Sequence, residues 1–235
     1  MVLVSPRNPL NIGAAARAMS NFGSFHLRLV NPYQVAFREA RSAVGATSLL
    51  TNAREYATIA EAVSDCQLVV GTTAIRHREL QHSLYDVAQG SKVIRKKLRV
   101  QKVALLFGSE KFGLSNEDIS HCDWLMHVPT HKSHVSMNLG QAVAVCLYEL
   151  GRGGPVPPSV AEKTTSASAA DIERITLGWY EALSVSGYIK PRVEKSTELK
   201  LRRMIRRLNL SSDDAKVWLG MLRQVLWKLN NHAKS

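Results

Sequence analysis

The chain has 235 residues, 45% of them hydrophobic and 21% charged, a composition typical of a soluble globular protein with one or two domains. No apolar run approaches the length of a membrane span, and the N-terminus lacks the basic and apolar regions of a signal peptide. We therefore expect a cytoplasmic protein without a membrane partner, and its formal net charge of +12 indicates a polyanionic partner such as nucleic acid.

Short β-branched runs alternate with helical patterns over residues 1–150. This alternation predicts an α/β fold, in which a parallel sheet is covered by helices on both faces. The expected strands are 2–4, 26–30, 67–70, 103–107 and 124–128, and helical periodicity appears over 12–22, 36–46, 55–64, 84–98 and 138–150.

The junction between the first strand and the first helix combines Asn11, Gly13 and Arg17. Arg17 falls among Ala and Met residues, so we expect it on a buried helix face. It would need an anionic partner there, because an unpaired guanidinium is costly to desolvate. A capped surface helix with a solvated Arg17 is the alternative, and this junction taken alone favours it.

Three of the expected strands run straight into polar or glycine-containing loops. These loops are Gly71-Thr72-Thr73, Gly108-Ser109-Glu110 and Pro129-Thr130-His131. Ligands of open α/β sheets bind at the carboxyl ends of the strands. The sequence therefore predicts a site where these three loops meet.

The pair Gly108 and Gly113 has the spacing of a phosphate-binding P-loop, but Leu114 stands where that motif requires Lys. A nucleoside triphosphatase is therefore improbable, and a dinucleotide enzyme is disfavoured because the chain has no GxGxxG at a strand-to-helix turn. What remains is a glycine that permits close approach of a ligand, with the carboxylate of Glu110 beside it. Alternatively, Glu110 caps a helix around 116–119.

Ser136 and Asn138 lie where a loop becomes the apolar helix that follows. Ser136 taken alone is best explained as an N-cap. Asn138 indicates more, because an amide in the first turn of a helix usually has a specific hydrogen-bond partner.

No pattern for a metal site is present. Cys66, Cys122 and Cys146 are far apart and free of CxxC spacing, so we expect buried free thiols. The separation of His131 and His134 matches no standard zinc pattern, and surface or RNA-facing histidines are the better interpretation.

The composition changes after Gly151, where a Gly/Pro-rich run and then a Thr/Ser/Ala-rich run predict a linker over 155–169. Beyond the linker only helical patterns appear. Ser168 with Asp171, and Ser211 with Asp214, each resemble a capping box at the start of a helix.

An arginine-rich segment lies between these two helices, over 201–208. At about 100° per residue, its four apolar residues share one narrow face and its four arginines the opposite one. Like charges at this spacing repel one another, which makes four arginines unusual on a solvated face. A contact with RNA phosphates and a solvated outer face are therefore equally favoured interpretations. The apolar residues are Leu201, Met204, Ile205 and Leu208, and the arginines are Arg202, Arg203, Arg206 and Arg207.

Three of these motifs together resemble a known family. The segments 11–17, 107–114 and 136–139 are similar in order and spacing to motifs 1, 2 and 3 of the SpoU/TrmH group of SPOUT RNA 2′-O-methyltransferases. The resemblance implies a SPOUT α/β knot over 1–154, with a C-terminal trefoil knot. The chain would continue through the linker into a small all-α, basic RNA-binding domain over 170–235.

The resemblance also implies an S-adenosylmethionine cofactor, no metal, and a homodimer whose active sites lie across the interface. The catalytic residues would be Asn11, Arg17, Glu110, Ser136 and Asn138. Arg17 has been proposed as a general base in this family, but Arg stays protonated in proteins, so binding a phosphate and stabilising the 2′-oxyanion is the safer role. Glu110 as proton acceptor is the less favoured alternative. The cofactor would lie against Thr72, Thr73, Ala74, Gly108, Val128, Val135, Ser136 and Met137.

The C-terminal segment 198–225 resembles the helical domain appended to one tRNA methyltransferase of this group, which acts at nucleotide 32 of the anticodon loop. This implies tRNA as the substrate. Another tRNA site, ribosomal RNA, or a catalytically silent RNA-binding protein remain alternatives. Leu10 and Ser109 depart from residues common in the family, often Gly and Arg, which concerns substrate contacts rather than the catalytic positions.

Overall fold

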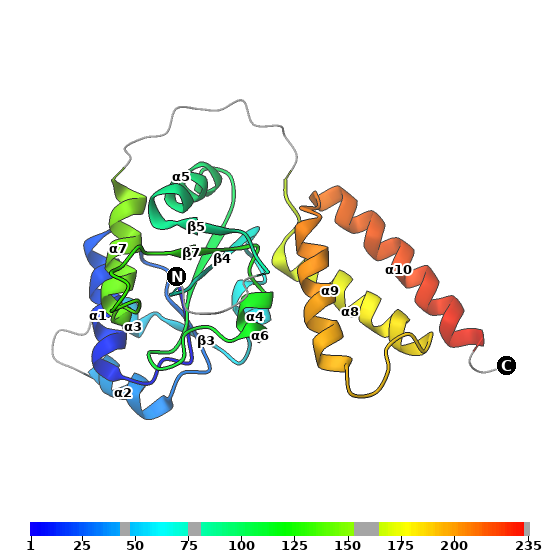
Figure 1. The fold of residues 1–235 in the computed structure, drawn as a ribbon, viewed down its shortest axis with the longest axis horizontal. Helices are drawn as coiled ribbons and strands as arrows, with labels where there is room; N and C mark the ends of the chain where they lie inside the picture. Colours follow the sequence, from blue (N-terminus) through cyan, green and yellow to red (C-terminus); the bar gives the residue numbers. More distant parts are fainter. Residues whose placement is uncertain (43–47, 75–80, 153–164, 233–235) are drawn as a thin grey trace.

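The computed structural model describes residues 1–42, 48–74, 81–152 and 165–232. Its centre is a seven-stranded sheet in the order β3-β2-β1-β6-β4-β7-β5, and every pair of neighbours is parallel. Helices cover both faces of this sheet, and three further helices, α8, α9 and α10, pack at one side of it (Figure 1). None of the helices in the described ranges is long and apolar enough to span a membrane.

All five expected strands are present, and two strands were missed. The missed strands, β3 and β5, are three-residue strands at the two edges of the sheet, without the continuous apolar run that marks a buried strand. The predictions that placed 54–56 and 84–86 at helix starts are therefore wrong in part. The strands are β1 (Val2–Val4), β2 (Arg28–Val30), β3 (Arg54–Tyr56), β4 (Leu68–Thr72), β5 (Leu84–Asp86), β6 (Val103–Phe107) and β7 (Trp124–His127).

Helix starts follow the capping rules. Asn8 caps the first helix with Pro9 at its first position, and Thr58 with Glu61 forms a capping box that begins α4 only after the edge strand β3. The predicted helix over 36–46 lies outside the described residues from 43 onward. The helices that accompany the sheet are α1 (Pro9–Asn21), α2 (Gln34–Ser42), α3 (Ser48–Thr51), α4 (Ile59–Val63), α5 (Val87–Leu98), α6 (Asn116–Ser120) and α7 (Leu139–Gly151).

Alternate residues of the central strands feed two separate cores. Phe107 belongs to the larger core, between the sheet and the helices α1, α2, α3, α5 and α7. Leu106 points the other way, into a core beneath α4 and α6. Helices α1 and α7 cross closely, since a Cβ placed on Gly140 would lie 2.6 Å from the Cβ of Ala14.

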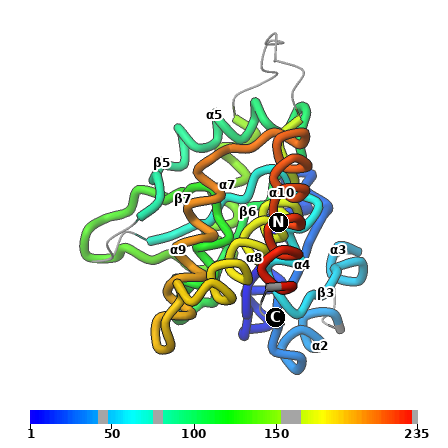
Figure 2. The backbone as a smooth tube through the Cα atoms, turned by 90° about the vertical axis from the view of Figure 1, so that its right-hand side faces the viewer, coloured from blue at the N-terminus to red at the C-terminus, as the bar shows by residue number. Residues whose placement is uncertain are grey.

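The chain after 165 is helical, as expected, with α8 (Ala169–Val185), α9 (Glu194–Arg207) and α10 (Ser212–His232). Both predicted caps are confirmed, because the Ser168 and Ser211 hydroxyls accept the backbone N–H of Asp171 and Asp214, each at 3.0–3.1 Å. The three helices have a small core of their own, in which the rings of Trp179 and Trp218 meet edge to face. Figure 2 views these helices in front of the sheet.

The predicted linker over 155–169 is described only in its last five residues. Residues 155–164 lie outside the described residues, and the last five residues of the predicted linker are held by backbone hydrogen bonds. Ala167 N–H donates to Leu210 (2.9 Å), and Ala169 N–H donates to the carbonyl of Cys66 in the turn before β4 (2.7 Å). Ala167 and Ala169 are buried, so the chain enters α8 already packed against the sheet.

Candidate functional site

One cavity of about 370 Å³ lies at the carboxyl edge of the sheet. It forms where β4, β6 and β7 end, so the three predicted loops do meet at one place. Its volume is that of a small-molecule site. All eight positions expected to hold the cofactor line it, together with the carboxylate of Glu110: Thr72, Thr73, Ala74, Gly108, Val128, Val135, Ser136 and Met137.

Gly108 is needed here for a different reason from the one predicted. A Cβ at this position would lie 2.0 Å from the carbonyl carbon of Gly113 and 2.2 Å from the nitrogen of Leu114. The Cβ position is therefore filled by the chain's own turn over 109–113, and Gly108 also lines the cavity. Gly113 has a φ of +67°, which lets the turn close, and the buried side chain of Leu114 anchors it in the core.

Glu110 holds two segments of the site together. Its carboxylate accepts the backbone N–H of Arg7 and of Asn8, both at 3.1 Å, and the side-chain amide of Asn11 at 3.3 Å. The turn before α1 is thereby tied to the loop after β6. Glu110 does not cap α6, since Ser115 and Asp118 form a capping box there. The alternative reading of Glu110 as a helix cap is wrong.

Asn138 has the specific partners expected of it. Its side-chain oxygen caps α7 by accepting the N–H of Gly140 (2.9 Å) and Gln141 (3.4 Å). Its side-chain nitrogen donates to the side-chain oxygen of Asn11 at 2.6 Å. One chain of hydrogen bonds thus runs Asn138–Asn11–Glu110 and fixes the starts of α1 and α7 against the cavity.

Ser136 is exposed at the mouth of the cavity and is not the N-cap of α7, because Asn138 has that place. Within the described part of the chain, no hydrogen bond engages the backbone N–H groups of Val135, Ser136 and Met137. A cavity-lining loop with unengaged donors is suited to a ligand that carries acceptors.

Arg17 is exposed, as in the alternative of a capped surface helix, and does not lie on a buried helix face. Ala15, Ala16 and Ala18 are buried, but Arg17 is exposed between them and does not line the cavity. The physical reason is the helical period, which places Arg17 one and two turns along from Ala14 and Leu10 on the outward face of α1. Leu10 is 79% exposed, so this face joins an apolar side chain to a cation.

The cysteines are buried free thiols, as predicted. Cys146 lines the base of the cavity, and burial raises the pKa of its thiol to about 12, which makes it a poor nucleophile. Within the described ranges, no three His, Cys, Asp or Glu side chains gather as metal ligands would.

Two of the four arginines in α9 are buried against the protein, which corrects the prediction that all four share an exposed face. Arg202 is 4% exposed and donates to Glu173 (2.8 and 2.9 Å) and Glu198 (2.5 Å). Arg206 is 6% exposed and donates to Asp123 at 3.1 Å. Buried guanidiniums require such carboxylates, and these lie far away in the sequence or on a neighbouring turn.

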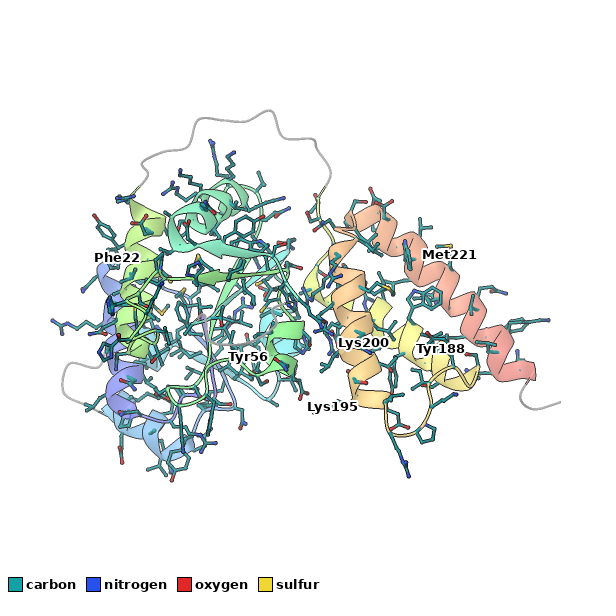
Figure 3. The ribbon with its side chains drawn as sticks, in the orientation of Figure 1. Phe22, Tyr56, Tyr188, Lys195, Lys200 and Met221 are labelled. Atoms are coloured by element: carbon teal, nitrogen blue, oxygen red, sulfur yellow. The ribbon has the colours of Figure 1, made fainter. Side chains whose placement is uncertain are left out.

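The apolar face predicted for α9 is also shifted. Leu201 and Ile205 are buried as expected, but Met204 and Leu208 are 53% and 46% exposed. Arg202 and Arg206 lie on the buried side of α9 in place of Met204 and Leu208, because each pairs with a carboxylate there. Figure 3 shows α9 beside α6 with Lys195 labelled near the gap between them, where Lys195 pairs with Glu117 at 2.7 Å.

Arg203 and Arg207 remain partly or fully exposed. Arg207 donates to the carbonyl of Gln81 at 3.0 Å, and Arg203 makes no hydrogen bond or ion pair to a described residue. These two arginines keep the expected freedom to meet an anion from outside.

No sequence pattern marks the groups that complete the cavity and the contacts of α9. The backbone N–H groups of Arg7 and Asn8 lie in the Pro/Asn-rich turn, and no sequence pattern indicates that Glu110 accepts their hydrogen bonds. No pattern in the sequence marks Asp123 or Glu173 as a partner of a buried arginine. An excess of arginine on one helix was the only signal that buried carboxylates existed elsewhere.

Comparisons with known proteins agree on one family. The profile of the SpoU rRNA Methylase family matches residues 1–148. The tRNA (cytidine/uridine/adenosine-2′-O-)-methyltransferase TrmJ of Pseudomonas aeruginosa is 34% identical, over 94% of this chain and 91% of its own. TrmJ of Yersinia enterocolitica, a tRNA (cytidine/uridine-2′-O-)-methyltransferase, is 31% identical over 96% of this chain and 90% of its own. The crystal structure of TrmJ from Z. mobilis ZM4 superposes with a TM-score of 0.83 at 30% identity, covering 95% of this chain and 97% of that one.

Proposed function

The chain belongs to the SpoU rRNA Methylase family, and on this premise we propose that it methylates a ribose 2′-OH in tRNA, with S-adenosylmethionine as the methyl donor. The observation that carries the proposal is the cavity at the carboxyl edge, lined by all eight expected cofactor positions. The full-length similarity to TrmJ proteins, whose names state a tRNA 2′-O-methyltransferase activity, supports tRNA as the substrate.

The cavity suits a nucleoside-containing cofactor. Apolar side chains of Met126, Val128 and Leu139 offer a wall for an adenine ring, and the unengaged N–H groups of 135–137 offer donors for its acceptor nitrogens. S-adenosylmethionine, when bound, supplies a methyl group already activated on a sulfonium. The protein's own task is then to hold and align the ribose and to exclude competing water.

Arg17 reaches a cavity only if another subunit brings it there. It lies on the outward face of α1 with Leu10, which is 79% exposed, and Phe22 and Tyr148 on neighbouring α1 and α7 surfaces are 43% and 53% exposed. We infer that this face is the interface of a homodimer, and that each cavity receives the Arg17 of the partner subunit. The outward position of Arg17 on α1 is compatible with this assembly.

Removal of the 2′-OH proton leaves negative charge on the attacking oxygen. The guanidinium of Arg17 stabilises that charge and binds a neighbouring phosphate, since Arg does not lose its own proton. The network of Asn138, Asn11 and Glu110 positions the two helix starts around the ribose. Glu110 already accepts three N–H groups, so a positioning role fits it better than proton transfer.

The finer assignments rest on the resemblance and remain part of the proposal. We place the target at nucleotide 32 of the anticodon loop, because full-length similarity to TrmJ proteins includes the C-terminal helices. We also propose a trefoil knot near 129–138, which the sheet order and the packing of α7 on α1 support, and a basic C-terminal domain from about 170 that contacts tRNA in the cytoplasm. Within that domain, Arg203 and Arg207 are the two of the four arginines that stay partly or fully exposed, and they keep the RNA-contacting role predicted for them.

Nucleoside mass spectrometry of tRNA tests the proposed function. Unmodified tRNA transcripts are incubated with S-adenosylmethionine and either the wild type or Arg17→Ala. We expect a 2′-O-methylated nucleoside that maps to position 32, and a loss of about 10²–10³-fold in its rate of formation with Arg17→Ala. Exposed Arg38→Ala on α2 is the matched control and should act like the wild type. Methylation of ribosomal RNA but not tRNA, or no methylation by the wild type, would refute the proposal.

A further inference from the structure

A second cavity, of about 440 Å³, lies between α9 and the sheet and is separate from the cofactor cavity. It opens where β5 and β7 begin, whereas the cofactor cavity lies where β7 ends. Four residues of β7 separate the two, which corresponds to roughly 13 Å along the strand. Its lining is Gln81, His82, Ser83, Cys122, Asp123, Arg203, Arg206 and Arg207.

Two buried side-chain nitrogen atoms of this second cavity have no hydrogen-bond partner among the described residues. The Nε–H group of Arg206 is buried without a hydrogen-bond partner, although the side chain is 96% buried and its Nη1 donates to Asp123. The Nε2 atom of His82 is likewise buried and unpartnered. A guanidinium N–H can only donate, so what is missing is an acceptor. Unsatisfied buried donors are rare in folded proteins and call for an explanation.

The net charge of the lining also favours an anionic ligand. Three guanidiniums, from Arg203, Arg206 and Arg207, face a single carboxylate, that of Asp123. Each oxygen of that carboxylate already has a donor, because Oδ1 accepts from Arg206 and Oδ2 accepts the backbone N–H of Val69 at 2.7 Å. Burial, and then these three arginines, lower the pKa of His82 to about 4, which reflects the positive field in the cavity.

Arg203 is the group best placed to complete the site. It lines the cavity, is half-buried and makes no ion pair with a described residue. The lining thus combines three guanidiniums from α9 with the imidazole of His82 from the segment before β5. A tetrahedral oxyanion matches such a set, since arginines bind phosphate oxygens with paired N–H groups.

We propose that this second cavity binds a phosphate group of the RNA backbone, through Arg203, Arg206, Arg207 and His82. The inference rests on the proposed RNA substrate and adds to it an anchoring point separated from the site of methyl transfer. A phosphate held there carries no sequence information but fixes the register of the RNA on the protein.

The test measures tRNA affinity of the full-length protein across a series of salt concentrations. For Arg203→Ala we expect about fivefold weaker binding near 0.1 M salt and a salt dependence reduced by about one counterion. Arg223→Ala, an exposed arginine on α10 with the same change in charge, is the matched control and should alter neither quantity. Arg207→Ala provides a second variant should Arg203→Ala fail to fold, and each variant's thermal unfolding is recorded.

Inorganic phosphate, added at constant ionic strength, separates two sources of the same ligand chemistry. Unchanged tRNA affinity in Arg203→Ala, with phosphate raising the melting temperature of the wild type alone, would overturn the RNA assignment in favour of free phosphate. Equal losses in Arg203→Ala and Arg223→Ala would overturn the cavity as a specific site. Methylation by the wild type is scored separately, so a failure of the proposed function is distinguished from a failure of this anchoring site.

Discussion

The two edges of the sheet are built in different ways. At the carboxyl edge, the cavity is shaped by backbone turns and by the short network of Asn138, Asn11 and Glu110. At the amino edge, α9 is docked by long side chains, with Arg202 and Arg206 each reaching buried or half-buried carboxylates. The first arrangement holds the backbone around a small-molecule site with short hydrogen bonds. The second joins two parts of the chain and leaves further arginines facing outward.

The largest expected effect on stability comes from Arg202→Met at the amino edge of the sheet, where α9 docks (the docked edge). Removing this guanidinium leaves the carboxylate of Glu173, whose side chain is 15% exposed, without its main partner. Breaking one side of such a buried pair costs about 3–5 kcal/mol of stability. Chemical denaturation would measure the loss, and Lys200→Met on the exposed side of the same helix should change stability by less than about 0.5 kcal/mol. Equal losses in both variants would show that α9 is not held by this ion pair.

A slightly smaller effect is expected at the carboxyl edge from Gly108→Ala. The new Cβ would meet the backbone of Gly113 at 2.0 Å, so the turn over 109–113 must move, at a cost of about 3 kcal/mol. Gly220→Ala on α10 is the control, because nothing lies within 4 Å of its Cβ and helix propensity improves. A Gly108→Ala protein as stable as the wild type would contradict the close packing of this turn.

The docked edge should also respond to acid. Burial, and then the Arg202 guanidinium, lower the pKa of His121 to about 4, below its unfolded value of 6.5. The stability that this neutral imidazole contributes is therefore fully present above pH 6.5 and is lost as the pH falls toward 4. The loss amounts to roughly 2–3 kcal/mol.

Denaturant unfolding between pH 4 and pH 7 would reveal this response. In His121→Gln the slope of stability against pH should flatten over that range, whereas the exposed His26→Gln should retain the wild-type slope. An unchanged slope in His121→Gln would show that other groups govern the acid response.

The carboxyl edge could be predicted from the sequence because its residues directly follow strands that the sequence itself indicates. Three loops that follow buried strands must meet at one edge of a parallel sheet, so Thr72 and Gly108 follow from strand ends, whereas Val128 came from the family resemblance. Asn138 was identified from its place in the first turn. The outward position of Arg17 matches the alternative of a solvated surface helix, and the run of alanines around it does not show which side of the helix is buried.

The amino edge could not be predicted in the same way. Whether Arg202 faces solvent or protein depends on Glu173 and Ser120, which are 29 and 82 residues away along the chain. The hydrophobic period alone placed Met204 and Leu208 inside, but buried ion pairs override it in α9. The short edge strands β3 and β5 escaped for a related reason, since partial exposure removes the apolar pattern that marks a strand.

Calorimetric titration with S-adenosylhomocysteine tests most directly whether the carboxyl edge alone holds the cofactor. We expect one site per chain in the wild type and equal affinity in Arg203→Ala, which changes only the opposite edge. We expect no binding in Ser136→Trp, because the indole of this exposed position would occupy the mouth of the cavity. No binding to the wild type, or loss of binding in Arg203→Ala with Ser136→Trp unaffected, would contradict this separation of the two edges.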